Sequence, residues 1–385
     1  MVDENMIVAA IPFVNCHGLF STAWSRLPHP LSPAPGEKNR PCANKCEILR
    51  PTGTRKESPV QTSRQVVENA IEFRGPDRLP LIFPSLGMSD IHDIPWNQAG
   101  TGDHLKSKTY DEWGCGWERT EKKNMGQITE HPLLQWRSLA SYRWPDPDDS
   151  RFYEGMEERF DGSEGKYPLT YIFMLLFERM HGLHGFQNTL EDLYLETERI
   201  GDLADRIVEF DIRLVENISA RFPGLIRGIS FTDDWGTELA LFIGPEKWKE
   251  FFMPRYARIF KACKAAGWHV WMHSCGRVND IIEPLIGIGL DVINLQQPRA
   301  LGIEEIGRSF AGRICFSSLC DIQHTLPGKG AEEIQREAEL LLRAWGTPDG
   351  GFILSDYGDG EAIGVATEKK RIMLDAFTEC DRWRA

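Results

Sequence analysis

The chain has 385 residues, of which 41% are hydrophobic and 26% charged, and it carries a formal net charge of −13. This is globular composition, with enough apolar material for a sizeable core in one large domain or two medium ones. The negative charge argues against nucleic acid or an anionic membrane as a partner, and the absence of an eighteen-residue apolar run predicts no transmembrane helix.

Nine cysteines are scattered along the chain. Their odd number and irregular spacing do not form a disulfide framework and suit a reducing compartment. The N-terminus opens with Val2, Asp3 and Glu4, which lack the basic flank of a signal peptide. We therefore expect a cytoplasmic protein.

Residues 1–60 differ from the rest of the chain. They are rich in proline and carry no sustained helix or strand period apart from a short apolar segment near the start. Such a segment buries too little apolar surface to offset the entropy of ordering it. We expect a disordered extension over residues 1–60 and a folded domain over residues 61–385.

The first regular elements are a helix and a strand. Thr62 or Ser63 can cap a helix over 62–73, whose apolar residues recur at helical spacing. The apolar stretch 79–83 then predicts a buried strand. The segment 111–126 indicates an irregular excursion or a hairpin.

From residue 167 onward, predicted strands alternate with predicted helices. The strands cover 169–173, 226–231, 270–272, 290–295, 314–317 and 351–354. The helices cover 191–222, 245–267, 278–287, 303–309, 331–345 and 367–377. With 79–83, these strands make seven candidates for a parallel sheet covered by helices. No Gly-x-Gly-x-x-Gly turn follows an early strand, so a dinucleotide-binding fold is disfavoured and the pattern predicts an α/β fold, a (β/α)8 TIM barrel with one strand not located.

His273 and Cys275 follow the predicted strand 270–272 and lie two residues apart. Alternate residues of a strand point to the same face, so the imidazole and the thiol would lie side by side. Together they make half of a zinc site. The alternative is a packed histidine beside an inert buried thiol.

Polar side chains also follow the other predicted strands, where the chemistry of a TIM barrel is found. Asp233 and Asp234 are the catalytic candidates, and we expect one of them to cap a helix and the other to face the pocket. The expected substrate-binding residues are Trp235, Asn294, Gln296, Asp321, Gln323 and Tyr357.

Five long stretches point to a known family. They are RQVVENAIEFRGPDRLPLIF (64–83), DEWGCGW (111–117), FTDDWGTELALFIGPEKWKEFFMPRY (231–256), HSCGRVNDIIEPLIGIGLDVINLQQP (273–298) and LCDIQHTLPGKGAEEI (319–334). Through them the chain resembles the uroporphyrinogen decarboxylase superfamily, from about residue 60 to the C-terminus. The resemblance implies a (β/α)8 barrel over residues 61–385, in agreement with the alternation of strands and helices.

The resemblance admits two chemistries. The haem-pathway decarboxylase uses neither metal nor cofactor and grips substrate carboxylates with arginines that follow its first strand. The branch similar to methylcobalamin:coenzyme M methyltransferase uses zinc, bound by a His-x-Cys pair and a later cysteine. His273 and Cys275 match the methyltransferase branch, and the segment 84–95 contains no arginine.

The third zinc ligand of that branch is a cysteine in a Gly-Cys-Gly turn, where this chain has YGD (357–359). The resemblance therefore implies zinc bound by His273 and Cys275, with Asp356 or Cys320 as the third ligand, or a site that lacks one. Zinc accepts carboxylate oxygen as well as sulfur, so the substitution is compatible with a metal.

The resemblance implies an enzyme that moves a methyl group between a corrinoid, carried by a partner protein, and a thiol or similar acceptor. Two alternatives stay open. One is decarboxylation of a tetrapyrrole or another carboxylated ring, and the other is a non-catalytic barrel that binds a corrinoid or tetrapyrrole. In each case the ligand is a small molecule, and neither nucleic acid nor a membrane is expected as a partner.

Overall fold

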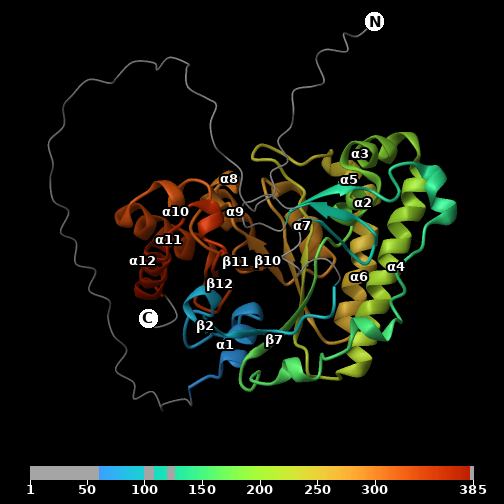
Figure 1. Ribbon diagram of the computed structural model, residues 1–385. Helices are drawn as coiled ribbons and strands as arrows, with labels where there is room; N and C mark the ends of the chain where they lie inside the picture. The colour runs from blue at the N-terminus through green and yellow to red at the C-terminus, as the bar shows by residue number, and fades with distance from the viewer. Residues whose placement is uncertain (1–59, 99–107, 119–125, 382–385) are drawn as a thin grey trace, which may run out of the picture.

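The structure, a computed structural model, describes residues 60–98, 108–118 and 126–381. A nearly closed barrel sheet lies at its centre, with the strand order β2-β1-β12-β11-β10-β9-β8-β7-β3, and helices surround it (Figure 1). Each neighbouring pair in this sheet is parallel except β1 with β2. The predicted TIM barrel is therefore confirmed. The predicted extension over residues 1–60 lies almost entirely outside the described residues.

The strands have the following bounds: β1 (Leu81–Phe83), β2 (Met88–Ser89), β3 (Ile91–Asp93), β4 (Lys108–Tyr110), β5 (Gly116–Glu118), β6 (Gln127–Glu130), β7 (Tyr167–Ile172), β8 (Gly228–Thr232), β9 (His269–His273), β10 (Val292–Leu295), β11 (Cys315–Ser318) and β12 (Phe352–Ser355). The helices are α1 (Ser63–Ile71), α2 (Phe177–His184), α3 (Phe186–Leu195), α4 (Thr197–Arg221), α5 (Pro245–Phe251), α6 (Met253–Ala265), α7 (Asn279–Gly287), α8 (Pro298–Leu301), α9 (Ile303–Phe310), α10 (Thr325–Gly328), α11 (Ala331–Trp345) and α12 (Thr367–Glu379). Short 3-10 turns lie between some of them.

The strand that the sequence did not locate is β3, which pairs with β7 in parallel. It follows β1 after a tight turn and the antiparallel strand β2, without an intervening α-helix. Between β2 and β3, Asp90 joins the two edges of the sheet. Its backbone N–H donates to the Leu81 carbonyl at 2.8 Å, and its carbonyl accepts from the Tyr167 N–H at 2.9 Å.

Two helices that the sequence predicted as continuous are interrupted. The region 245–267 divides into α5 and α6 because Pro254, in the first turn of α6, has no N–H to continue the hydrogen bonds of α5. The region 191–222 likewise divides into α3 and α4 at Glu196. At the other end of the domain, Thr62 caps α1 through a capping box with Gln65, as predicted.

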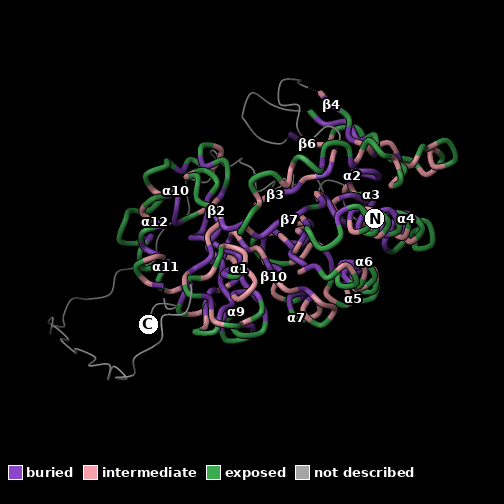
Figure 2. Tube along the Cα trace, turned by 90° about the horizontal axis from the view of Figure 1, so that it is seen from below, coloured by how far each residue is buried: buried purple, intermediate pink, exposed green. Residues whose placement is uncertain are grey.

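The core lies between the strands and the inner faces of the helices. Buried positions follow the strands, and exposed positions follow the outer helix faces (Figure 2). Helix α4 shows why: its apolar residues recur every three or four positions, so Leu203, Ile207 and Leu214 share the face that is buried. Among the described residues, no helix is long and apolar enough to cross a membrane.

A small second sheet, β4-β5-β6, is antiparallel and corresponds to the predicted hairpin region. Asp111, directly after β4, holds it together from inside. The Asp111 carboxylate accepts hydrogen bonds from the backbone of Cys115, the indole of Trp117 and the guanidinium of Arg179 in α2. This buried network fixes the small sheet to the start of α2, beside the carboxyl ends of β7 and β8.

Candidate functional site

The carboxyl ends of β8 and β9 bring together three side chains of the types that bind metal ions. These strands are adjacent and parallel, with Thr232 opposite His273, so the residues that follow them share one edge of the barrel. The side chains are Asp234 after β8, and His273 and Cys275 at the end of β9. Within the described part of the chain, their ligand atoms form a group in which all lie within 4.8 Å of one another.

The distances within this group suit a common ion. The Nε2 atom of His273 lies 3.3 Å from the Cys275 sulfur and 3.6 Å from Oδ1 of Asp234. Nitrogen, sulfur and carboxylate oxygen are the donors that zinc prefers, and three protein ligands leave a fourth position for a substrate. The residues therefore fit a zinc ion. Cysteine binds a metal as its thiolate, so Cys275 must be reduced and deprotonated to take part.

Asn294, on the next strand, determines the orientation of the His273 ring. Its amide nitrogen donates to the Ser317 carbonyl at 2.9 Å, which leaves its Oδ1 to face the Nδ1 of His273 at 2.7 Å. Because that oxygen can only accept, Nδ1 carries the proton, and Nε2 is left with its lone pair toward Asp234 and Cys275. Metal-binding histidines are commonly fixed in this way.

Two glycines allow the turn that carries Cys275 to approach the loop after β8. Gly276 has φ +79, and a Cβ there would lie 2.2 Å from the Gly236 carbonyl oxygen. A Cβ on Gly236 would lie 2.8 Å from the Arg277 nitrogen. This close approach lets the Cys275 N–H donate to Oδ1 of Asp234 at 2.8 Å.

Asp233 and Asp234 have different roles. Asp233 is fully buried, and its carboxylate accepts from the backbone N–H groups of Leu176, Phe177 and Glu178 at the start of α2. It also accepts from the Tyr256 hydroxyl. Burial raises the pKa of Asp233 to about 6, and these hydrogen bonds oppose the rise. One aspartate thus caps a helix and the other faces the pocket.

A cavity of about 470 Å³ opens beside His273 and Asp234. Its other walls come from α2, from the loop before α3 and from the small sheet, and include Trp117, Phe173 and Glu178. Glu178 was not among the site residues predicted from the sequence. Burial raises its pKa well above the ordinary value, and the nearby charges of Asp234 and Asp233 add to the rise. Thr232 donates to it at 3.1 Å.

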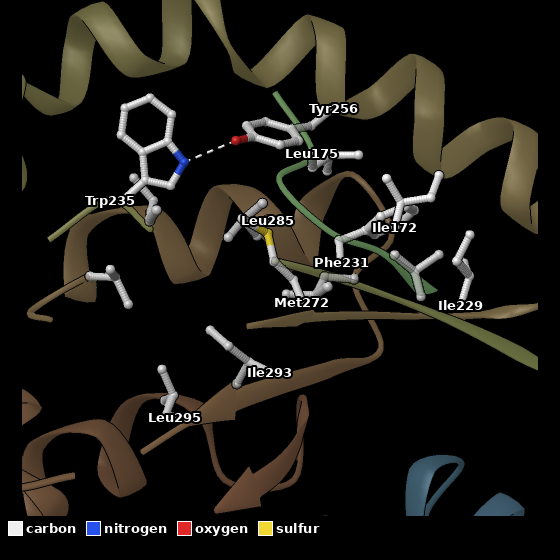
Figure 3. Close-up of a cluster of buried hydrophobic side chains, with 14 of the residues drawn as sticks. Ile172, Leu175, Ile229, Phe231, Trp235, Tyr256, Met272, Leu285, Ile293 and Leu295 are labelled. Atoms are coloured by element: carbon white, nitrogen blue, oxygen red, sulfur yellow. Dashed lines mark hydrogen bonds between the residues drawn. The ribbon is translucent and has the colours of Figure 1, made fainter. Parts of the chain in front are cut away.

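None of the six residues predicted to bind substrate is among the residues that line this cavity. Trp235 is fully buried in the core, where its indole donates to the Tyr256 hydroxyl at 2.9 Å (Figure 3) and stacks on Phe177. Asp321 is fully buried and accepts from the backbone of Gln323 and His324. The Gln296 carbonyl accepts from the Ile322 N–H, and Tyr357 is buried after β12.

The two residues expected to supply a third ligand lie elsewhere. Cys320 is fully buried, and its sulfur contacts the Ile334 carbonyl at 3.5 Å. Asp356 forms a buried ion pair with Lys370 at 2.9 Å, and Ser85 donates to its other oxygen. Neither belongs to the group formed by Asp234, His273 and Cys275, in which Asp234 occupies the third place.

One of the similar solved structures supports the fold by its superposition. A methyltransferase from Methanosarcina mazei superposes with a TM-score of 0.58 at 14% identity, covering 83% of this chain and 99% of that one. A glycoside hydrolase family 5 enzyme from Prevotella bryantii B14 covers 81% of this chain and 98% of its own, with a TM-score of 0.39 and 9% identity. A comparison with curated proteins returned no match.

The family follows from a sequence model rather than from these superpositions. The model described as uroporphyrinogen decarboxylase (URO-D) matches residues 168–380, which include all but the first residue of β7, the strands β8 to β12 and all three members of the candidate metal group. Because this match spans more than half of the chain, the protein belongs to the uroporphyrinogen decarboxylase family.

Proposed function

We propose that the protein is a zinc-dependent methyltransferase, which moves a methyl group between a corrinoid on a partner protein and a thiol or similar acceptor. The observation that carries the proposal is the convergence of Asp234, His273 and Cys275 at the barrel edge. Zinc bound there would lower the pKa of a coordinated thiol, so that its thiolate exists at neutral pH.

The chain's own groups have separate tasks in this proposal. His273, held by Asn294, presents Nε2 to the metal position, and Asp234 supplies an oxygen from the neighbouring strand end. Glu178 is the other carboxyl group on the wall of the cavity, and its raised pKa suits holding a proton near a reacting substrate. Asp233 keeps the start of α2, and therefore Glu178, in place.

Elemental analysis of the reduced, purified protein tests the metal. We expect close to one zinc per chain, and loss of most of it in His273→Ala and in Cys275→Ser. His131→Ala is the matched control because His131 lines the same cavity but is not a member of the metal group. Absence of zinc from the reduced wild-type protein, or its full retention in His273→Ala, rules the proposal out.

Decarboxylation of a tetrapyrrole is the alternative that the family keeps open, and the cavity does not favour it. None of the described side chains that line it is arginine or lysine. A substrate with several carboxylates needs such cations to balance its charge. Incubation with uroporphyrinogen, followed by chromatography, separates the two functions, since a decarboxylated product would support the alternative.

The non-catalytic barrel is disfavoured by the same geometry that supports the metal. A barrel that only binds a ligand has no need of three zinc-type donors within reach of one another.

A further inference from the structure

The inner wall of the barrel changes from apolar to polar near the carboxyl ends of its strands. On six strands an inward apolar residue belongs to one buried cluster, and the residue two positions later points to the same side with a polar side chain. These pairs are Ile91 and Asp93, Leu169 and Tyr171, Trp271 and His273, Val292 and Asn294, Cys315 and Ser317, and Ile353 and Ser355. The second members form a polar ring at the mouth of the barrel.

Part of this polar ring already has a task. His273 belongs to the candidate metal group, Asn294 orients its imidazole, and Ser317 fixes the Asn294 amide. Asp93 and Tyr171 have no such task, and both are exposed rather than packed into the core. A molecule bound at the mouth of the barrel can therefore reach them.

Asp93 and Tyr171 lie close together on neighbouring strands. β3 pairs with β7 in parallel, with Asp93 opposite Leu169, two residues before Tyr171. Desolvation raises the pKa of Tyr171, and the nearby Asp93 carboxyl adds to the rise. Desolvation also raises the pKa of Asp93 itself. The protein has therefore displaced part of the water around both groups, although each keeps an exposed face.

This pair lies across the mouth of the barrel from the metal group. The strands β3, β7, β8 and β9 are consecutive in the sheet, so Asp93 starts three strands away from His273. Through the pairings of β7 and β8, Asp93 is in register with His269. The shear of a TIM barrel, about one residue per strand, moves the position level with Asp93 to about Met272, next to His273. A small molecule bound at the metal position can therefore extend across the mouth to Asp93.

The charges at the mouth do not favour an anion. Among the inward residues of the described strands, none is lysine or arginine. Arg159 lies near Tyr171, but its guanidinium donates to two oxygens of the segment 95–97. His92 points to the outer side of β3, where its Nε2 contacts the Arg159 carbonyl at 2.8 Å. The charge of a zinc ion would be matched by the carboxylate and the thiolate of the metal group. An anionic group beside Asp93 would thus be repelled.

We infer that the methyl acceptor is a short thiol whose uncharged tail ends in a hydrogen-bond donor, and that Asp93 and Tyr171 bind this tail. The inference rests on the proposed function, because it takes the acceptor to be a thiol bound at the metal position. An Asp93 carboxyl accepts a hydrogen bond in either protonation state, and the Tyr171 hydroxyl can donate or accept. A charged tail would have to give up more of its hydration than a hydroxyl group in this partly desolvated place.

Three thiols of similar length test the inference by isothermal titration calorimetry with the full-length, reduced and zinc-loaded protein. Mercaptopropanol has a tail that donates a hydrogen bond, butanethiol has an alkyl tail, and mercaptopropionate has an anionic tail. We expect mercaptopropanol to bind about fivefold more tightly than butanethiol, since one net hydrogen bond is worth about this ratio. Mercaptopropionate should bind most weakly, because its carboxylate would lie beside Asp93.

Variants assign the preference to the two residues. Asp93→Ala should bring mercaptopropanol down to the affinity of butanethiol and strengthen mercaptopropionate about fivefold, a gain that a merely structural role would not produce. Tyr171→Phe should weaken mercaptopropanol about threefold and leave butanethiol nearly unchanged. Asp202→Ala in α4 and Tyr194→Phe in α3 are the matched controls, because they remove the same groups from exposed helix positions. Both controls should bind all three thiols as the wild type does.

The result is separable from the test of the metal. The tail determines the ratio of the three affinities, so the ratio should persist after a chelator removes zinc, although all three thiols then bind more weakly. A protein that holds zinc but binds the three thiols equally, or binds mercaptopropionate most tightly, overturns the inference alone. A preference for mercaptopropanol in a protein that never binds zinc overturns the proposed function alone. A preference that both Asp93→Ala and Tyr171→Phe leave unchanged also contradicts the inference.

Discussion

At the scale of single residues, Asn294 determines which nitrogen of His273 faces the cavity. The Asn294 amide is itself fixed by the Ser317 carbonyl, so the chain Ser317–Asn294–His273 leaves no choice of tautomer. The sequence reading expected Asn294 to bind substrate. An asparagine at the end of a strand suggests a contact with a ligand. The contact of Asn294 with His273 follows instead from the pairing of β10 with β9, which sets these two residues side by side.

Replacing Asn294 should weaken the metal site without emptying the cavity. In Asn294→Ala the imidazole loses the acceptor for its Nδ1 proton, and we expect zinc affinity to fall about 10- to 100-fold. Competition with a chromophoric chelator measures this. Asn188→Ala is the control, because Asn188 lines the cavity but bonds the Leu134 carbonyl. Unchanged affinity in Asn294→Ala would show that this hydrogen bond does not prepare the metal site.

At the scale of elements, the small sheet β4-β5-β6 supplies a wall of the cavity, and Asp111 connects it to the barrel. The Asp111–Arg179 ion pair is buried on both sides, with side-chain exposures of 1% and 3%. The sequence predicted an irregular excursion or a hairpin here, but it did not indicate that this segment lines the site. Trp117 and Ile128 reach the cavity because of contacts with α2 that lie far away in the chain, and a local pattern does not encode such contacts.

Asp111→Ala should therefore destabilise the protein strongly. It leaves the Arg179 charge buried without its main partner, which costs about 3–5 kcal/mol in comparable buried pairs. Urea unfolding measures the change. Asp148→Ala, which breaks the exposed pair with Arg213, is the control and should have little effect. A loss of stability in Asp111→Ala no larger than in the control would refute the anchoring role.

At the scale of the whole molecule, the barrel closes where the sequence pattern is weakest. The alternation of strands and helices after residue 167 is long and regular, so those strands and the same-face pair at the end of β9 could be predicted. The strand β3 has three residues and no preceding helix, and therefore leaves no periodic signal. The place of Asp234 in the candidate metal group could not be predicted either. Asp234 lies beside His273 only because β8 pairs with β9, and the local sequence does not reveal that pairing.

Closure of the barrel sheet depends on contacts of Asp90. Its carboxylate accepts from both Nη atoms of Arg78, from the Ser63 hydroxyl and from the Leu81 N–H. Asp90→Ala keeps the two backbone hydrogen bonds of residue 90 but removes these carboxylate contacts, and we expect a loss of about 2 kcal/mol or more in the free energy of unfolding, since hydrogen bonds to charged groups are worth about that much each. Hydrogen exchange should increase in β1 and β3 together. Faster exchange confined to the turn itself would argue against a role in closure.

The central claim is that Asp234, His273 and Cys275 hold one metal ion, and zinc X-ray absorption of the reduced protein tests it most directly. We expect one sulfur neighbour at about 2.3 Å and nitrogen or oxygen neighbours at about 2.0–2.2 Å. The sulfur contribution should disappear in Cys275→Ser, while the lighter neighbours remain. A first shell of nitrogen and oxygen alone in the wild type, or a spectrum that Cys275→Ser and His273→Ala leave unchanged, would contradict the account.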